Sequence, residues 1–280
     1  MIQLAGLISG HYECRSLTET IPVLTNFLAL EVVAESEGRA IVKHPNTDWL
    51  LVVQAAGSSA PDKPRMNHYG VRVATDQEIE NAYEYLQKMK KAFRLKVDRI
   101  RDNHHAHSVH FVEPGGNWWE IESYEKVANA GMGDTAAPHW KKALTEADFP
   151  GRGYIPQALT HGTLQCDNLE QTRRFYEEAL ELEVVQSWPT SIYVKHRSSP
   201  WYIVNLESKP ETRQYLSSAQ RFTLNVESAV AVFEAHDWLK KHKDEFDLTE
   251  LGEVQEQAGM SYFLLSDLNR NWWEIASPLH

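Results

Sequence analysis

Asn117-Trp118-Trp119-Glu120-Ile121 recurs as Asn271-Trp272-Trp273-Glu274-Ile275, and each pentapeptide ends a stretch that matches the other over most of its length. Both copies set one carboxylate between apolar neighbours in what reads as a strand. An unpartnered charge in such a place is costly, and a nearby cation is the simplest compensation. The sequence therefore predicts a duplicated chain with one buried acid, Glu120 or Glu274, in each half.

The repeat extends well beyond the pentapeptide. Residues 28–33 (Leu-Ala-Leu-Glu-Val-Val) align with residues 180–185 (Leu-Glu-Leu-Glu-Val-Val), and the same gapless register places Cys14 on Cys166. A disulfide between equivalent positions would need the two strands side by side, so we expect two buried free thiols. The two halves share one architecture.

Length and composition agree with a duplicated globular chain. A chain of 280 residues with 42% apolar content can bury substantial cores and is expected to form two domains. We place the first domain at residues 1–124, a linker rich in glycine and proline at 125–157, and the second domain at 158–280.

The charge of the chain narrows the classes of partner. A formal net charge of −11 argues against a nucleic-acid surface, which needs clustered Lys and Arg. No targeting segment is apparent, and no apolar run approaches the roughly 18 residues that a membrane span requires. We expect a soluble cytoplasmic protein that acts on a small molecule, without nucleic-acid or membrane partners.

The first half divides into two βαβββ repeats. Hydrophobic periodicity predicts a strand, a helix and further strands in each, and the second repeat closes with a hairpin through Pro114-Gly115-Gly116. The predicted elements are 7–14, helix 18–29, 31–34, 40–42 and 49–54, then 67–73, helix 76–93, 109–112 and 118–122.

The second half repeats the same order. It has a strand at 160–166 with a helix at 169–180, then a strand at 221–226 with a helix at 229–246, and a last strand at 272–276. The predicted fold class is α+β, with four tandem βαβββ repeats that form two half-barrel modules.

At this point the chain resembles the vicinal oxygen chelate superfamily. The resemblance rests on the four repeats, on His161 opening a strand fourteen residues before Phe175-Tyr176, and on a Trp-Glu-Ile strand after a turn rich in Gly or Asn. It covers nearly the whole chain except the linker. The superfamily includes extradiol ring-cleaving dioxygenases, glyoxalases, fosfomycin-resistance transferases, epimerases and metal-free antibiotic-binding proteins, so it implies the fold more securely than any one activity.

The resemblance also implies where a metal would bind. In the family, ligands come from the first strand of each of two paired repeats and from the last strand of one of them. The corresponding positions here are Ser9, His68, His161 and Arg221 on first strands, and Glu120 and Glu274 on last strands. Only His68, Glu120 and His161 complete a set of two histidines and one carboxylate.

These three residues belong to the second and third repeats. The superfamily shows both sequential pairing of repeats and an exchanged arrangement of an inner and an outer pair, and only the exchanged one gathers these ligands. We therefore predict exchanged pairing. The outer pair would hold Ser9, Arg221 and Glu274, where a guanidinium can neutralise the carboxylate directly, so we expect no metal there.

A rival site stays open at this stage. His11 lies two residues after Ser9 and on the same face of its strand. With a two-residue shift, His11, His68 and Glu120 would form a site under sequential pairing. His161 fits the family position without a gap, whereas His11 does not.

The ligand set suggests the chemistry. Two imidazoles and one carboxylate on one face of an octahedral ion are typical of non-haem Fe(II) oxygenases, although Mn(II), Ni(II) or Zn(II) would also fit. Open positions would let a substrate chelate the ion through two adjacent oxygens. By resemblance we expect a metal-dependent oxidoreductase, an Fe(II) extradiol-type dioxygenase that opens a catecholic ring. The alternatives are a glyoxalase-like lyase or isomerase and a metal-free binder that confers antibiotic resistance.

A segment rich in histidine precedes the hairpin to Glu120. In ring-cleaving relatives a histidine from this region moves a proton, which needs a base that titrates near neutrality. We expect His104, His105 or His107 to be that catalytic residue, against the alternative of a solvated surface loop. Four repeats in one chain can close both cavities, so a monomer and a homodimer are both compatible with the sequence.

Overall fold

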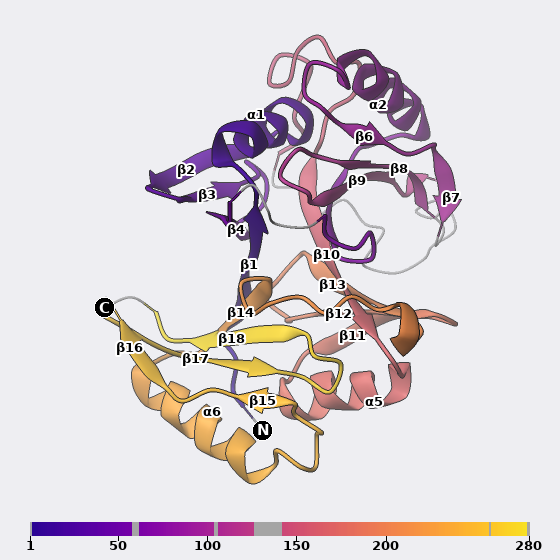
Figure 1. Cartoon of the computed structure of the whole chain (residues 1–280). Coiled ribbons are helices and arrows are strands. Elements are labelled where there is room, and N and C mark those ends of the chain that lie inside the picture. Colours follow the sequence, from indigo (N-terminus) through magenta and orange to yellow (C-terminus); the bar gives the residue numbers. More distant parts are fainter. Residues whose placement is uncertain (1, 58–61, 104–105, 126–141, 258, 279–280) are drawn as a thin grey trace. The chain divides into compact units, whose positions relative to one another are not determined.

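The computed structural model describes residues 2–57, 62–103, 106–125, 142–257 and 259–278 (Figure 1). By internal contacts the chain forms two compact units. We call Glu13–Thr163 the central unit, and Met1–Tyr12 with Leu164–His280 the terminal unit. The expected domain limits at 124 and 158 stay a prediction, and the contact boundaries lie instead at Tyr12 and Thr163, inside two strands.

The central unit begins with a helix over a small antiparallel sheet. The helix α1 (Leu17–Leu28) buries Val23, Leu24 and Phe27, because apolar residues recur at helical spacing along one face. It is followed by β2 (Glu31–Ser36), β3 (Arg39–Lys43) and β4 (Leu50–Ala55), paired in that order.

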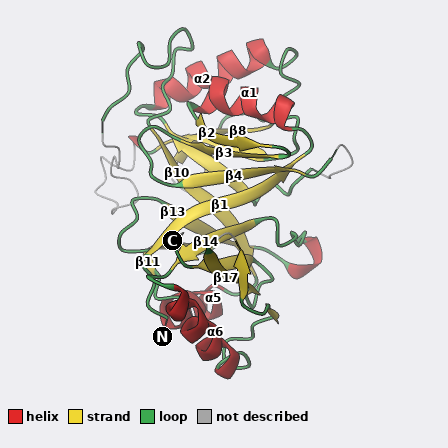
Figure 2. Ribbon diagram, turned by 90° about the vertical axis from the view of Figure 1, so that its left-hand side faces the viewer, coloured by secondary structure: helices red, strands yellow, loops and turns green. Residues whose placement is uncertain are grey.

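A second sheet of the central unit carries the candidate site. Its strand order is β10-β5-β9-β8-β6, and β7 also pairs with β8. The helix α2 (Asp76–Met89) packs against β8 and β9, and lies beside α1 on the same side of the unit (Figure 2). The strand bounds are β5 His68–Arg72, β6 Lys96–Val97, β7 Arg101–Asn103, β8 Ala106–Val112, β9 Trp118–Ser123 and β10 Ala158–Cys166.

The terminal unit has the same plan. The order β15-β17-β18-β14-β1 forms one sheet, with β16 on β17 and α6 (Ala229–Lys241) packed on β17 and β18. Strands β11, β12 and β13 pair in order and follow a helix whose last turn is a π-helix. The bounds are β1 Gly6–Cys14, α5 Leu169–Arg174, η1 Phe175–Ala179, β11 Glu183–Trp188, β12 Ser191–Lys195, β13 Tyr202–Glu207, η2 Pro210–Thr212, β14 Arg221–Asn225, β15 Glu250–Leu251, β16 Gln255–Gln257, β17 Met260–Ser266 and β18 Trp272–Ala276.

Exchanged pairing of the repeats is confirmed. The first strand of the third repeat, β10, runs antiparallel to the first strand of the second repeat, β5, with His161 opposite Gly70. The first strands of the first and fourth repeats, β1 and β14, pair in the same way, with Ser9 opposite Thr223. Both pairs shift register just before these residues. The mixed α+β architecture of the prediction is likewise present.

Several predicted boundaries differ from the structure. The helices expected at 76–93 and 229–246 end earlier, at Met89 and Lys241. The chain turns after each, and Arg94 and Asp247 adopt left-handed backbone angles that end the helical path. Both cysteines are free and buried, as expected. Within the described ranges, every helix is too short or too polar to cross a lipid bilayer.

Candidate metal centre

Three strands of the central unit bring His68, Glu120 and His161 together. His68 opens β5, Glu120 lies on β9 beside Gly70, and His161 lies on β10 opposite Gly70. One ligand atom from each residue falls within 4.8 Å of the other two. All three side chains are buried. The two histidines come from different halves of the chain, so the cluster depends on the exchanged pairing.

The backbone fixes the tautomer of His68. Its Nδ1 lies 2.7 Å from the carbonyl oxygen of Arg65, which can only accept a hydrogen bond, so Nδ1 carries the proton. The other nitrogen, Nε2, then presents a lone pair 3.2 Å from Glu120 Oε2. This is the arrangement that orients a histidine ligand toward a metal ion.

A carboxylate orients His161 in the same manner. Its Nδ1 lies 3.3 Å from Glu122 Oε1, and its Nε2 lies 3.2 Å from Glu120 Oε2. Glu122 is itself held by the guanidinium of Arg72 at 2.8 Å. Burial alone would lower the pKa of His161, but the carboxylates of Glu122 and Glu120 raise it to about 9.

The convergence of these groups calls for a cation. When both rings are neutral, with each Nδ1 proton directed outward, the two Nε2 atoms and Glu120 Oε2 are all acceptors that face one another. Burial opposes ionisation of Glu120, yet the surrounding imidazoles hold the pKa of this carboxyl well below its usual range. A proton on His161 can relieve the repulsion between acceptors, and a divalent metal ion can do so for all three. The donor set fits a transition-metal ion with open positions.

A fourth histidine, His110, borders the cluster and was missed by sequence reasoning. It lies on β8 directly opposite Glu120, with Nε2 3.4 Å from Glu120 Oε1. Its Nδ1 lies 3.2 Å from Nη2 of Arg65, which can only donate, so the proton of His110 is on Nε2. Burial lowers the pKa of His110 to about 3, so the ring is neutral. The register of the 109–122 hairpin is the signal that would have found it.

The histidines predicted to transfer protons are placed differently. His107 lies on the opposite face of β8 from His110, where Nδ1 is 2.9 Å from Asp102 Oδ1 and Nε2 is 3.2 Å from Glu80 Oε1 of α2. The structure therefore does not bring His107 to the cluster, because successive residues of a strand point to opposite faces and His107 lies three residues from His110. His104 and His105 lie outside the described residues.

The rival ligand His11 lies in the terminal unit. Its Nε2 is 2.9 Å from Thr223 Oγ1, and that hydroxyl donates to Glu274 Oε1 at 2.9 Å. Arg221 donates to Glu274 Oε2 from Nε at 2.9 Å and from Nη2 at 2.8 Å. The prediction that a guanidinium neutralises Glu274 is confirmed. The position of His68 is thus occupied by Arg221 in this unit.

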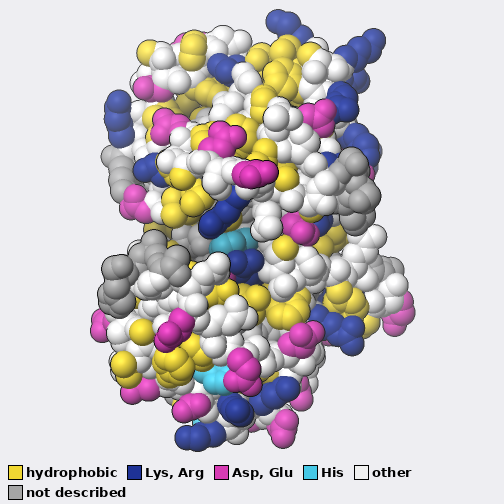
Figure 3. Space-filling view, turned by 60° about the vertical axis from the view of Figure 1, so that its left-hand side comes forward, with side chains coloured by type: hydrophobic (Ala, Val, Ile, Leu, Met, Phe, Trp, Pro, Cys, Tyr) yellow, Lys and Arg dark blue, Asp and Glu magenta, His cyan; other side chains and the backbone are white. Residues whose placement is uncertain are grey.

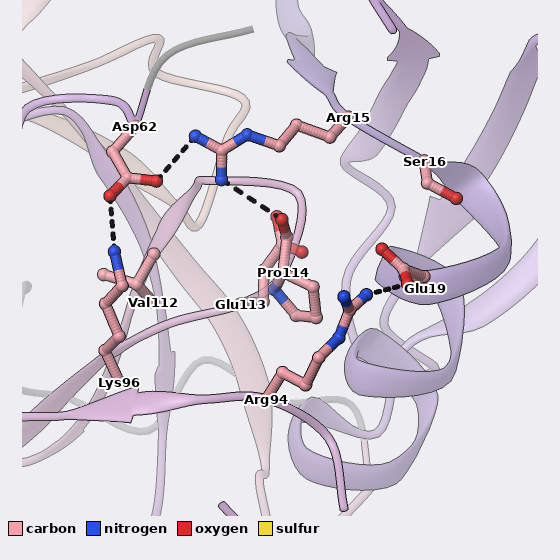
Figure 4. A pocket seen from close by; sticks show the side chains of 9 residues that line it. All are labelled: Arg15, Ser16, Glu19, Asp62, Arg94, Lys96, Val112, Glu113 and Pro114. Atoms are coloured by element: carbon pink, nitrogen blue, oxygen red, sulfur yellow. Dashed lines mark hydrogen bonds and ion pairs between the residues drawn. The ribbon is translucent and has the colours of Figure 1, made fainter. Parts of the chain in front are cut away.

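The molecular surface carries mixed charge. On the face shown in Figure 3, acidic and basic side chains are interspersed. A separate hollow of about 360 Å³ lies near the start of α1 (Figure 4). There Asp62 pairs with Arg15 at 2.8 Å and with Lys96 at 2.7 Å, and Glu19 pairs with Arg94. These charges are matched within the hollow, which does not include the histidine cluster.

A known family model matches part of the chain. Residues 16–121 match the family model described as Glyoxalase/Bleomycin resistance protein/Dioxygenase superfamily. Over this segment the chain is similar to members of that superfamily. The segment contains Glu120 and His68, while His161 lies beyond it. No curated protein matches the chain significantly.

Solved structures share the fold over nearly the whole chain. Glyoxalase I from Zea mays is 13% identical, with a TM-score of 0.66 over 97% of this chain and 92% of that chain. A candidate dioxygenase from Bacillus subtilis is also 13% identical, with a TM-score of 0.64 over 99% of this chain and 86% of that chain. At such identities the likeness shows a shared fold and leaves the reaction open.

Proposed function

We propose that the protein is a metal-dependent enzyme that binds a small substrate through two adjacent oxygens, and that it is an Fe(II) dioxygenase of the extradiol type. The observation that carries the proposal is the convergence of His68 Nε2, His161 Nε2 and Glu120 Oε2, three buried atoms able to ligate a metal ion that lie within 4.8 Å of one another. Two histidines and one carboxylate are the ligand set of non-haem Fe(II) oxygenases.

The surrounding residues prepare this ligand set. Arg65 fixes His68 through its carbonyl oxygen, and Glu122 fixes His161 through its carboxylate. His110 holds Oε1 of Glu120 and leaves Oε2 directed at the two imidazoles. An Fe(II) ion in this position would supply open coordination sites for two substrate oxygens and for dioxygen. The chain's own contribution is to keep the three ligands oriented and largely shielded from water.

Fewer histidines are candidates for proton transfer than the sequence suggested. We give no such role to His107, because Asp102 and Glu80 bind it on the other face of the sheet. Both nitrogens of His110 are engaged, one by Arg65 and one by Glu120, so we assign it to positioning. His104 and His105 remain predicted candidates for the acid and base.

A second reaction uses the same ligands. A glyoxalase-like isomerase would use Zn(II) or Ni(II) as a Lewis acid to stabilise an enediolate. The likeness to glyoxalase I supports this candidate through the fold only. A metal-free binder is the third candidate. The mutually facing acceptors disfavour it, because without an ion they repel one another or must hold a proton.

The test separates the three candidates. The protein is purified without oxygen, its metal content is measured, and oxygen uptake is followed with a panel of catechols. We expect uptake with Fe(II) that is lost in His161→Ala and retained in His11→Ala. Isomerisation of a thiohemiacetal by the Zn(II) or Ni(II) form, without oxygen uptake by the Fe(II) form, would favour the isomerase. Failure of Fe(II), Mn(II) and Zn(II) to raise the melting temperature would favour the binder.

A further inference from the structure

Polar side chains continue from the metal centre along the same face of the sheet. Ser108 lies two residues before His110 on β8, directly opposite Glu122 on β9. Arg101 on β7 lies directly opposite Ser108. Residues opposite one another in an antiparallel pair project to the same side. Ser108 and Arg101 therefore share the face that carries His110 and Glu120.

Two donors on this face have no partner. The hydroxyl of Ser108 is fully buried and makes no hydrogen bond within the part of the chain that the structure describes. The Nε atom of Arg101 is buried and likewise unpartnered among the described residues. A buried donor left unsatisfied costs about 1–3 kcal/mol, so a built site is expected to supply an acceptor. No acceptor of the described chain fills this role.

The guanidiniums beside these donors are only loosely neutralised. Arg65 Nη1 lies 3.4 Å from Asp98 Oδ2, and Arg101 Nη2 lies 3.8 Å from the same oxygen. By contrast, Arg72 approaches Glu122 to 2.8 Å. One carboxylate oxygen thus serves two guanidiniums at distances longer than a good hydrogen bond. The side chains of Arg65 and Arg101 are 27% and 37% exposed, so a dissolved ligand can reach them.

With a divalent ion bound, the net charge of the centre would favour a further anionic group. Among the residues that the structure describes, the charged side chains linked by contacts here are three carboxylates and three guanidiniums: Glu120, Glu122 and Asp98 with Arg65, Arg72 and Arg101. Their charges cancel, and the histidine ligands are neutral when they hold an ion. A divalent ion would then add two positive charges. A substrate that chelates with one oxygen deprotonated balances only one of them.

We infer that Arg101, Arg65 and Ser108 form a subsite for a carboxylate on the substrate, so that the protein takes catechols that bear an acidic group. This inference rests on the proposed function and specifies its substrate class. A carboxylate accepts two hydrogen bonds from one guanidinium in parallel, and it can also accept from a serine hydroxyl. One such group satisfies both unpartnered donors and supplies the missing negative charge.

The experiment compares ligands that differ only in these features. Binding of 3,4-dihydroxybenzoate, catechol and benzoate is measured by calorimetry to the Zn(II)-loaded and the metal-free protein. The variants are Arg101→Gln and Ser108→Ala. The control is Arg94→Gln, the same change at an exposed arginine of the hollow in Figure 4. Ser108→Ala removes a fully buried hydroxyl that has no hydrogen-bond partner among the described residues, so we expect the variant to fold at least as well as the wild type.

We expect 3,4-dihydroxybenzoate to bind the Zn(II) form about 10- to 100-fold more tightly than catechol, as a hydrogen-bonded charge predicts. Arg101→Gln should abolish that preference, Ser108→Ala should reduce it, and Arg94→Gln should keep it. Benzoate should bind the metal-free wild type and lose this binding in Arg101→Gln.

The outcomes distinguish the two claims. Equal binding of catechol and 3,4-dihydroxybenzoate to the Zn(II) form would overturn the subsite and leave the chelating centre standing. Binding of benzoate that depends on Arg101, with no effect of metal on any ligand, would keep the subsite and overturn the proposed function. Absence of all binding would overturn both.

Discussion

Gly70 lies directly opposite His161 across the pair of first strands, and a side chain at Gly70 would overlap the imidazole ring. The equivalent pair in the terminal unit is Thr223 opposite Ser9, where the large and small positions are reversed. The absence of a side chain at Gly70 thus leaves room for the imidazole ring of His161. In the terminal unit the space is taken by a hydroxyl that binds Glu274.

This pairing makes Gly70→Ala a test of the centre. The added methyl group must displace His161, so we expect a loss of metal binding and a destabilisation of about 1–3 kcal/mol from overpacking. Metal content and denaturant unfolding measure the two effects. Thr223→Ala is the control and should keep the metal. A Gly70→Ala protein that retains full metal affinity would show that His161 is not a ligand.

A substitution at Glu122 tests the contact that orients His161 toward the metal centre. Glu122→Gln replaces the carboxylate that holds His161 Nδ1, and we expect metal affinity to fall about 10- to 100-fold. Titration with a competing chelator measures this. Asp102→Asn alters the carboxylate beside His107 on the other face and should leave metal affinity unchanged. Equal effects of the two substitutions would contradict the assigned geometry.

Metal binding should depend on pH through His161. Its pKa of about 9 in the metal-free fold means that a proton occupies the ligand at neutral pH and must leave when the ion binds. We expect affinity to rise about tenfold per pH unit up to about pH 9 and then to level. Calorimetry in buffers of different ionisation enthalpy counts the released proton. Binding that does not change between pH 7 and 9 would speak against this ligand.

The same proton affects the stability of the metal-free protein. Because the folded pKa of His161 lies above its ordinary value of 6.5, the folded state binds the proton more tightly than the unfolded chain does. The stabilisation is therefore complete below about pH 6.5 and is lost as the pH rises toward 9. We expect His161→Gln to flatten this decline in the free energy of unfolding. An unchanged slope in the variant would contradict the prediction.

Arg221 tests the terminal unit independently. Arg221→Met would leave Glu274 without the guanidinium that pairs with it, and breaking such a buried pair typically costs about 3–5 kcal/mol. Because Arg221 is partly exposed, we expect a loss of stability near the lower end of this range. Urea unfolding measures the loss. Metal content should stay at the wild-type value. A drop in metal content without a loss of stability would contradict the assignment of Arg221 to an ion pair with Glu274.

Alignment of the four repeats in the sequence predicted the pairing of the repeats and the two buried acids. Aligning the repeats put Ser9, His68, His161 and Arg221 at equivalent first-strand positions, and only the two histidines among them complete a ligand set with Glu120. That difference led to exchanged pairing, which the β10-β5 pair confirms. The buried acids Glu120 and Glu274 were found in the same way, because a charge between apolar neighbours is conspicuous in a strand.

Other features depend on contacts that sequence does not encode locally. His110 was missed because its place opposite Glu120 follows from the hairpin register, while the richness of the neighbouring loop in histidine drew attention to His107. The strand β7 is too short for a periodic pattern, so Arg101 gave no signal. Space beside Gly70 becomes visible only when two distant strands are placed together.

The most direct test of the centre is the metal affinity of wild type, His161→Ala and His11→Ala, measured side by side on protein purified without oxygen. We predict one tightly bound divalent ion per chain in the wild type and in His11→Ala, and none in His161→Ala. Retention of the ion in His161→Ala together with its loss in His11→Ala would contradict the assignment.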